Sequence, residues 1–149
     1  MKTLFATDNG WAGLILRLTL GFVMFPHGAQ KMLGWYNGFG FSGTLNFFME
    51  TMHLPWLIAF LIIIGEFFGS LGLLIGFLTR FSAASIGVIM LGAISLVHSP
   101  HGFFMNWAGK QAGEGYEYHL LVLGISIALV IIGAGRWSVD GLIAKQLKG

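Results

Sequence analysis

Cysteine is missing from the 149-residue chain, and charged residues make up only 9% of it. The lack of cysteine excludes disulfides, thiolate metal sites, iron–sulfur clusters and cysteine nucleophiles. The shortage of charge argues against a soluble domain, in which about a quarter of the residues are charged. A net charge of only +2, with no basic run, gives no sign of nucleic-acid binding. The sequence also has no phosphate-binding glycine loop, dinucleotide fingerprint or hydrolase elbow.

What the chain does have is hydrophobic residues, 56% of the total, gathered in four apolar segments. A run of ~20 apolar residues crosses a bilayer as a helix, and we predict helices over 11–33, 54–78, 81–97 and 116–133. Pro26 is expected to kink the first helix, and 138–149 to lie on the membrane surface. The fold class is therefore an all-α membrane protein, a bundle of four transmembrane helices in one domain over 1–149.

Two longer connections, 34–53 and 99–115, are rich in aromatic residues, and we expect them to pack on the mouth of the bundle. The lysines and arginines predict its orientation, because cytoplasmic segments carry an excess of them. Lys31 and Lys110 fall on the side of the aromatic loops. More fall on the side of the termini: Lys2, Arg80, Arg136, Lys145 and Lys148. This bias places both termini in the cytoplasm and the aromatic loops outside.

Four glycines of the second predicted helix share one face: Gly65, Gly69, Gly72 and Gly76. Glycines spaced in this way allow another helix to approach closely. The neighbour is either another helix of the same chain or a second copy in a homodimer.

Glu66 stands in the middle of the otherwise uncharged run 54–78. A carboxylate at the centre of a bilayer costs roughly 2.5–3.5 kcal/mol, so it usually faces the interior of a bundle and finds a partner. We predict that the partner is Arg17 on the first helix. Such a pair either fixes the helix register or handles protons and polarises a carbonyl oxygen.

Several histidines are predicted to gather at the outer mouth of the bundle. His27 and Lys31 share a helix face at a spacing of four residues. If His27, His98, His119 and Glu117 converge there, they offer ligands for Cu, Zn, Fe or haem iron. The alternative is that these histidines only form hydrogen bonds to loop carbonyls.

Several short motifs, taken in order, make the chain resemble the DoxX family of small four-helix bacterial membrane proteins. Ser70 is a departure, since a second glycine is expected after Gly69. The motifs are Arg17; His27-Gly28 with Lys31; Glu66-x-x-Gly69; Gly76-x-x-Thr79-Arg80; His98 leading into Gly102-Phe103-Phe104; Gly115-Tyr116-Glu117-Tyr118; and Gly133-x-Gly135 with Ser138 and Asp140.

The resemblance implies a bacterial inner-membrane bundle associated with quinone, thiol or metal chemistry. Without cysteine, a dithiol mechanism is excluded, and whether the chain is itself an enzyme stays open. The leading hypothesis is a protein that binds a quinone-like molecule and works with a partner oxidoreductase. The alternatives are metal binding at the outer histidines and a non-catalytic assembly subunit. In the leading hypothesis Glu66 and Arg17 are catalytic, Arg80 holds a structural turn, and the substrate contacts are His27, Lys31, Tyr116 and Glu117.

Overall fold

The computed structural model describes residues 4–147, and every regular element in that part of the chain is helical. Turns of π-helix continue two of the helices, at Phe47–Thr51 and Ile94–His98, and a 3-10 turn follows at Ser99–His101. The helices are α1 (Trp11–Leu33), α2 (Gly40–Asn46), α3 (Trp56–Ile75), α4 (Thr79–Ala93), α5 (Glu117–Ile132) and α6 (Val139–Gln146).

Three helical stretches are long and apolar enough to cross a membrane: Trp11–Leu33, Trp56–Ile75 and Thr79–His101. Helix α5 is also apolar but has only 16 residues, ~24 Å at 1.5 Å per residue. The hydrocarbon core of a bilayer is ~30 Å thick. The chain is thus an all-α multi-pass membrane protein, and a fourth full crossing stays a prediction. The first helix has the bounds predicted for it, and it continues through Pro26 as one element.

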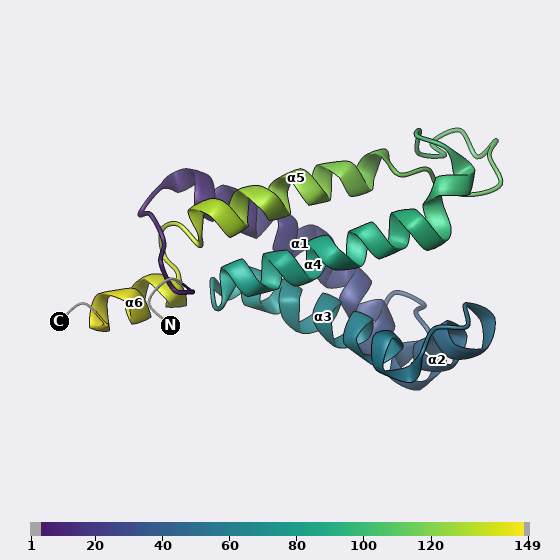
Figure 1. The fold of residues 1–149 in the computed structure, drawn as a ribbon, viewed down its shortest axis with the longest axis horizontal. Coiled ribbons are helices and arrows are strands. Elements are labelled where there is room, and N and C mark those ends of the chain that lie inside the picture. The colour runs from purple at the N-terminus through teal and green to yellow at the C-terminus, as the bar shows by residue number, and fades with distance from the viewer. Residues whose placement is uncertain (1–3, 148–149) are drawn as a thin grey trace.

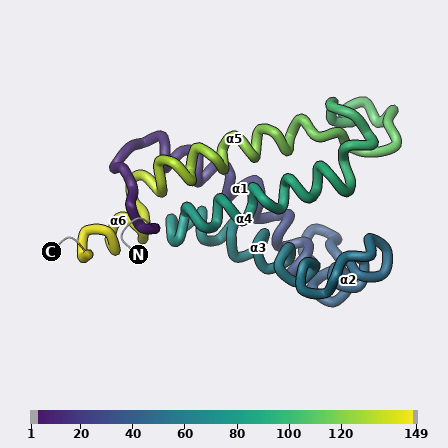
Figure 2. The backbone as a smooth tube through the Cα atoms, in the orientation of Figure 1, coloured from purple at the N-terminus to yellow at the C-terminus, as the bar shows by residue number. Residues whose placement is uncertain are grey.

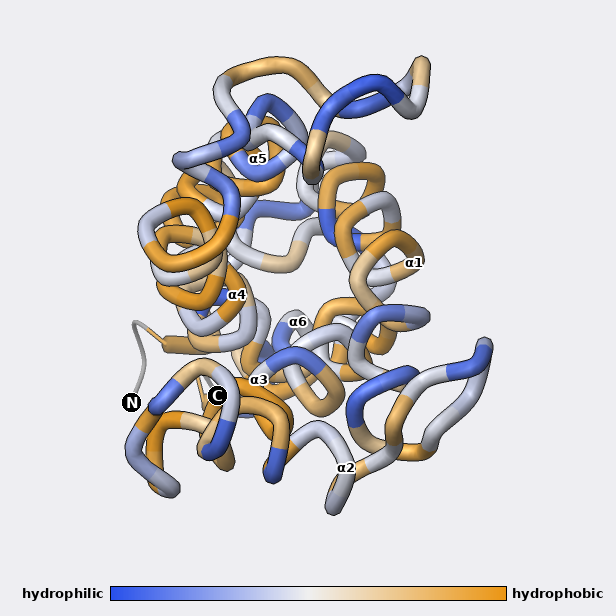
Figure 3. Tube along the Cα trace, turned by 90° about the vertical axis from the view of Figure 1, so that its right-hand side faces the viewer, coloured by the Kyte–Doolittle hydropathy of each residue, from blue (hydrophilic) through white to orange (hydrophobic). Residues whose placement is uncertain are grey.

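The four long helices lie side by side in a ring, in the order α1, α3, α4, α5, as seen from one end of the molecule (Figure 3). Helix α1 packs closely on α3, whereas its contact with α5, which closes the ring, is looser. All four helices contribute to one buried core: Leu20 and Met24 of α1, Leu73 of α3, Ile86 and Met90 of α4, and Val122 and Leu129 of α5.

The two ends of the bundle differ in what they hold (Figure 1). The segment before α1 lies close to α6 at one end, which we call the terminal end (Figure 2). Helix α2 and residues 99–116 lie at the opposite end, which we call the loop end. Lys2 and Lys148, which entered the orientation prediction, lie outside the described residues.

The first aromatic connection is largely helical, because it contains α2 and the π-helical turn after it. Phe48 of that turn is buried against Ala59 and Ile63 of α3. Other rings of the connection stay exposed, and Phe39 has an exposed fraction of 74%. The segment therefore packs along the first turns of α3 through one of its faces only.

Two glycines fix how α1 and α3 meet. A Cβ on Gly28 would stand 2.7 Å from the Cα of Phe67, and a Cβ on Gly21 would stand 3.0 Å from the side chain of Leu74. These two glycines are seven residues apart, so they lie on one face of α1. The close approach pairs Gly21 with Leu74 and Gly28 with Phe67, which sets an antiparallel register.

The glycine face of α3 is used within the chain. A Cβ on Gly65 would meet Ser85 and Ile89 of α4 at 2.8 and 2.9 Å, and Gly69 and Gly72 also face α4. Gly76 ends α3 in the left-handed conformation that glycine favours, with φ 70°. Of the two neighbours considered for this face, the structure shows the one in the same chain.

Candidate functional site

Glu66 is buried in the middle of α3, as predicted, but its partner is Lys31. The Nζ atom of Lys31, near the end of α1, lies 2.6 Å from Oε2 of Glu66. The Glu66 side chain has an exposed fraction of 5%, against 25% for Lys31. A charged pair with one member buried and one reaching the surface is accessible to a small molecule from the Lys31 side.

The predicted Arg17–Glu66 pair is wrong. Arg17 is also buried, but its guanidinium donates only to backbone carbonyls. Nε donates to Ala134, one terminal nitrogen to Leu73 and Leu74, and the other to Arg136 and Trp137, at 2.7–3.2 Å. A guanidinium has five N–H donors, and all of them are used here.

The register between α1 and α3 explains the error. Because Gly28 is opposite Phe67, Glu66 is opposite Ala29, twelve residues beyond Arg17 along α1. That separation is ~18 Å, too far for the two side chains to meet. Arg17 instead lies at the carboxyl ends of α3 and α5, where unpaired carbonyls and the helix dipoles favour a cation.

Arg17, which is buried, and Lys31, which is partly exposed, therefore differ in how many hydrogen-bond donors they leave free. Arg17 has no donor left. Lys31 has three donors, of which one is engaged with Glu66, and Oε1 of Glu66 accepts no hydrogen bond from the described residues. Oε1 of Glu66 is not one of the fully buried side-chain atoms that lack a hydrogen-bond partner, so another molecule can reach it. The Lys31–Glu66 pair thus has the capacity to bind a ligand, and the Arg17 cluster does not.

Tyr118 extends the site to α5. Its ring lies 6.5 Å from the His27 ring, between centroids, and its hydroxyl donates to the sulfur of Met24 at 3.6 Å. Sulfur is a weak acceptor, so this hydroxyl can exchange it for a better one. Met24, His27 and Lys31 recur at three- and four-residue steps, which places them along one side of α1. Tyr118 was not predicted as a site residue, although a tyrosine in the first turn of an apolar helix was a signal.

His98 and His119 form a second polar group at the loop end. Their ring centroids are 4.0 Å apart, and Nδ1 of His98 lies 2.8 Å from the carbonyl oxygen of Glu114. Because a carbonyl only accepts, that nitrogen carries the proton. His119 is buried, and its Nδ1 has no hydrogen-bond partner. The ring of His119 is also 5.5 Å from that of Tyr118.

The four-residue metal site expected from His27, His98, His119 and Glu117 is not formed. Across residues 4–147, no three His, Asp or Glu side chains lie close enough together to hold one metal ion. Glu117 is drawn into the loop instead, where its Oε1 accepts from the backbone N–H of Met105 at 2.9 Å and from the indole of Trp107 at 3.4 Å. The predicted convergence required the side chain of Glu117 to point into the bundle.

Two other predicted site residues, Tyr116 and Arg80, also make contacts within the chain that stabilise its fold. Tyr116 precedes α5 and packs edge-on against Phe103, 5.6 Å between centroids. Arg80 follows the turn between α3 and α4, and its guanidinium donates to the carbonyls of Ala6, at 3.0 Å, and Val130. Tyr116 and Glu117 therefore organise the loop around 102–107, and Arg80 holds the terminal end together.

Comparison with known proteins places this geometry in a family. Residues 12–99, which span α1 to α4, match the model of DoxX. The chain belongs to the DoxX family. The DoxX match includes Arg17, Lys31 and Glu66 but stops before Tyr118, so the α5 part of the site lies beyond it.

Three relatives cover most of the chain. It is 34% identical over 113 residues to "Inner membrane protein YqjF" of Escherichia coli (strain K12), covering 76% of this chain and 82% of the relative. It is 28% identical to an "Uncharacterized protein" of Haemophilus influenzae, covering 92% and 86% of the two chains. It is also 28% identical to "Putative oxidoreductase CatD" of Bacillus subtilis (strain 168), covering 91% and 89%. No solved structure matches the chain.

Proposed function

We propose that this DoxX protein binds a quinone-like or other small aromatic molecule at the Lys31–Glu66 pair and works with a partner oxidoreductase. The observation that carries the proposal is the unused hydrogen-bonding capacity of this pair inside a membrane protein, beside the rings of His27 and Tyr118. One relative has oxidoreductase in its name, which agrees with a redox role.

The chemistry of the pair suits such a ligand. A quinone offers carbonyl oxygens, to which the ammonium of Lys31 can donate, and its quinol form offers hydroxyls, from which Glu66 can accept. Aromatic side chains that line a site add contact area and orient a flat ring. Helix α5 contacts α1 less closely than α3 does, and we propose that a hydrophobic ligand enters from the bilayer between α1 and α5, next to Tyr118.

The reaction divides between this chain and its partner. Reduction of a quinone takes up two electrons and two protons. The partner oxidoreductase supplies the electrons, since a chain without cysteine has no dithiol to give them. Lys31 and Glu66 hold the oxygen that receives a proton. We also propose that the terminal end faces the cytoplasm, as the distribution of Lys and Arg predicts.

Quinone binding by purified variants tests the proposal. We would titrate the protein, in mild detergent, with a short-chain ubiquinone and measure Kd from the quenching of tryptophan fluorescence. A hydrogen bond to a charged group is worth about 1.5–3 kcal/mol, so Glu66→Gln and Lys31→Met should each raise Kd at least about tenfold. Lys110→Met removes an exposed lysine elsewhere on the loop-end side and should leave Kd unchanged.

A thermal melt of each variant without ligand shows whether it is folded. Folded Glu66→Gln and Lys31→Met proteins that bind the quinone as well as the wild type does would contradict the proposal. In that case the pair only fixes helix register, and the remaining hypothesis is an assembly subunit without a ligand site.

A further inference from the structure

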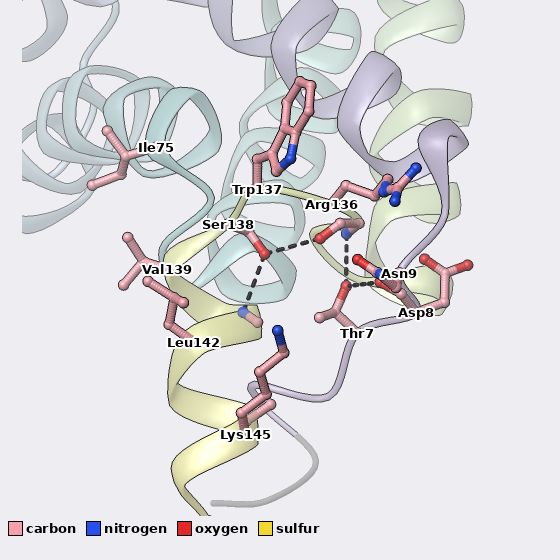
Figure 4. A pocket seen from close by; sticks show the side chains of 13 residues that line it. Thr7, Asp8, Asn9, Ile75, Arg136, Trp137, Ser138, Val139, Leu142 and Lys145 are labelled. Carbon is pink, nitrogen blue, oxygen red and sulfur yellow. Dashed lines mark hydrogen bonds between the residues drawn. The ribbon is translucent and has the colours of Figure 1, made fainter.

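A cleft of about 550 Å³ opens at the terminal end, between residues 7–9 and α6 (Figure 4). Arg136 and Lys145 line it, together with Thr7, Trp137 and Leu142. In Figure 4 the side chain of Lys145 rises from α6 on the side facing Thr7. The cleft is at the opposite end of the molecule from the loop-end segments, and none of the proposed quinone contacts lines it.

Hydrogen bonds fix the walls of this cleft. Thr7 Oγ1 accepts from the backbone N–H of Gly135 at 2.6 Å. Ser138 Oγ donates to the carbonyl of Gly135 at 2.9 Å and accepts from the N–H of Gly141 at 3.1 Å. Asp140 then ties α6 to α4, because its carboxylate accepts from the N–H groups of Leu78 and Thr79. A cleft with fixed walls loses little entropy when it binds a ligand.

The charges of the cleft favour an anion. Arg136 and Lys145 contribute two cations, and Asp8 is the carboxylate that lines the same space. One oxygen of Asp8 is occupied by the N–H of Gly10, at 3.2 Å. Asp140 is buried and engaged with α4, so it does not face the cleft. The guanidinium of Arg136 lies over the ring of Trp11, 4.7 Å from its centroid, which orients it without neutralising it.

The charges of the described residues are also distributed unevenly between the two ends of the molecule. Among the described residues, the terminal half holds four cations and two carboxylates: Arg17, Arg80, Arg136, Lys145, Asp8 and Asp140. The loop half holds two cations and four carboxylates: Lys31, Lys110, Glu50, Glu66, Glu114 and Glu117. The cleft therefore opens at the end of the molecule where cations outnumber carboxylates.

Exposed apolar side chains surround the cleft and place it at a membrane surface. Trp137 and Leu142 line it with exposed fractions of 76% and 63%, and Trp11, 51% exposed, meets Trp137 edge-on at 5.2 Å. Tryptophan is enriched where the headgroups of a bilayer meet its hydrocarbon core. A ligand in this cleft would therefore lie at headgroup depth, with apolar surface beside it for an acyl chain.

We propose that the cleft binds the phosphate of an anionic phospholipid headgroup. Arg136 and Lys145 pair with the phosphate, Thr7 and Asn9 offer polar contacts to the rest of the headgroup, and Trp137 and Leu142 contact the first part of the acyl chain. A soluble phosphate shares the anionic part of this chemistry but not the acyl chain, so the two sources can be separated by experiment.

Native mass spectrometry of the detergent-solubilised protein tests this proposal. We would titrate the protein with phosphatidylglycerol or with zwitterionic phosphatidylcholine and count bound lipids. Each cation near an anionic headgroup changes affinity by about fivefold. The double variant Arg136→Gln/Lys145→Gln should therefore lose roughly 20- to 30-fold in phosphatidylglycerol binding. As a control, Lys110→Gln removes one cation at the loop end. A second control, Arg136→Lys/Lys145→Arg, keeps both charges of the cleft. Both control variants should bind phosphatidylglycerol as the wild type does.

Three outcomes would overturn the proposal. The first is equal binding of the two lipids, and the second is an equal loss in Lys110→Gln. The third is displacement of phosphatidylglycerol by millimolar inorganic phosphate, which would assign the cleft to a soluble phosphate. Melting temperatures close to that of the wild type show that a loss of binding is not a loss of fold.

Discussion

Replacement of Arg17 should destabilise the protein strongly, because the guanidinium joins three parts of the chain. Its donors reach the last turn of α3, Ala134 after α5, and the segment that leads to α6. Arg17→Met keeps most of the apolar stem and removes every one of these bonds. Five carbonyl oxygens then lose a donor, two in the last turn of α3 and three in the segment between α5 and α6.

The magnitude follows from the bonds that are lost. A hydrogen bond to a charged group contributes about 1.5–3 kcal/mol, but bonds within one network do not add fully. We expect Arg17→Met to lower the free energy of unfolding by about 4 kcal/mol, comparable with breaking a buried ion pair. Arg17→Lys has at most three donors on a flexible stem, so it should lose roughly half as much.

Thermal and denaturant unfolding in detergent, followed by tryptophan fluorescence, measures both effects. The exposed Lys110→Gln should change stability by less than about 0.5 kcal/mol. The reasoning is refuted if Arg17→Met is as stable as the wild type. It is also refuted if Arg17→Lys folds with wild-type stability yet loses quinone binding, because Arg17 would then act at the ligand.

Two further substitutions test how the helices are held, each by thermal unfolding. Asp140→Asn weakens the cap that accepts from Leu78 and Thr79 at 2.7 and 2.8 Å, and should cost about 1 kcal/mol; an unchanged melting temperature would mean that this cap adds nothing. Gly28→Ala drives a Cβ against the backbone of Phe67, and should cost about 1–3 kcal/mol and weaken quinone binding by shifting Lys31 from Glu66. Gly124→Ala, where a Cβ meets nothing within 4 Å, is its control, and equal effects of the two would contradict the close approach of α1 and α3.

The helices could be predicted because apolar segments long enough for a bilayer are visible in the sequence. The first helix has its predicted bounds, and α3 and α5 lie within the predicted 54–78 and 116–133. The burial of Glu66 was also predictable, since a carboxylate in an apolar run must face inward. Helix α2 was not predicted, because its seven residues include two glycines and three polar residues and form no long apolar pattern.

The partner of Glu66 could not be predicted, because the 22 residues between α1 and α3 leave their register open. The depths of Arg17 and Glu66, counted along their helices from the side of the termini, differed by an amount that a long arginine side chain was expected to bridge. Gly21 and Gly28 were the available signal: seven residues apart on one face, they mark where α1 approaches its neighbour most closely. The direction of Glu117 depends on loop backbone N–H groups that no helical pattern describes.

The most direct test of the ligand site is photo-crosslinking with an azido-substituted quinone, followed by mass-spectrometric mapping of the labelled peptides. A ligand held by Lys31 and Glu66 should label α1 between Met24 and Lys31 and α5 around Tyr118, and unlabelled quinone should suppress both. Glu66→Gln should reduce this labelling, while Lys110→Met should not. Labelling confined to the terminal end, or spread evenly over the outer faces of the helices, would contradict an aromatic-ligand site at the Lys31–Glu66 pair.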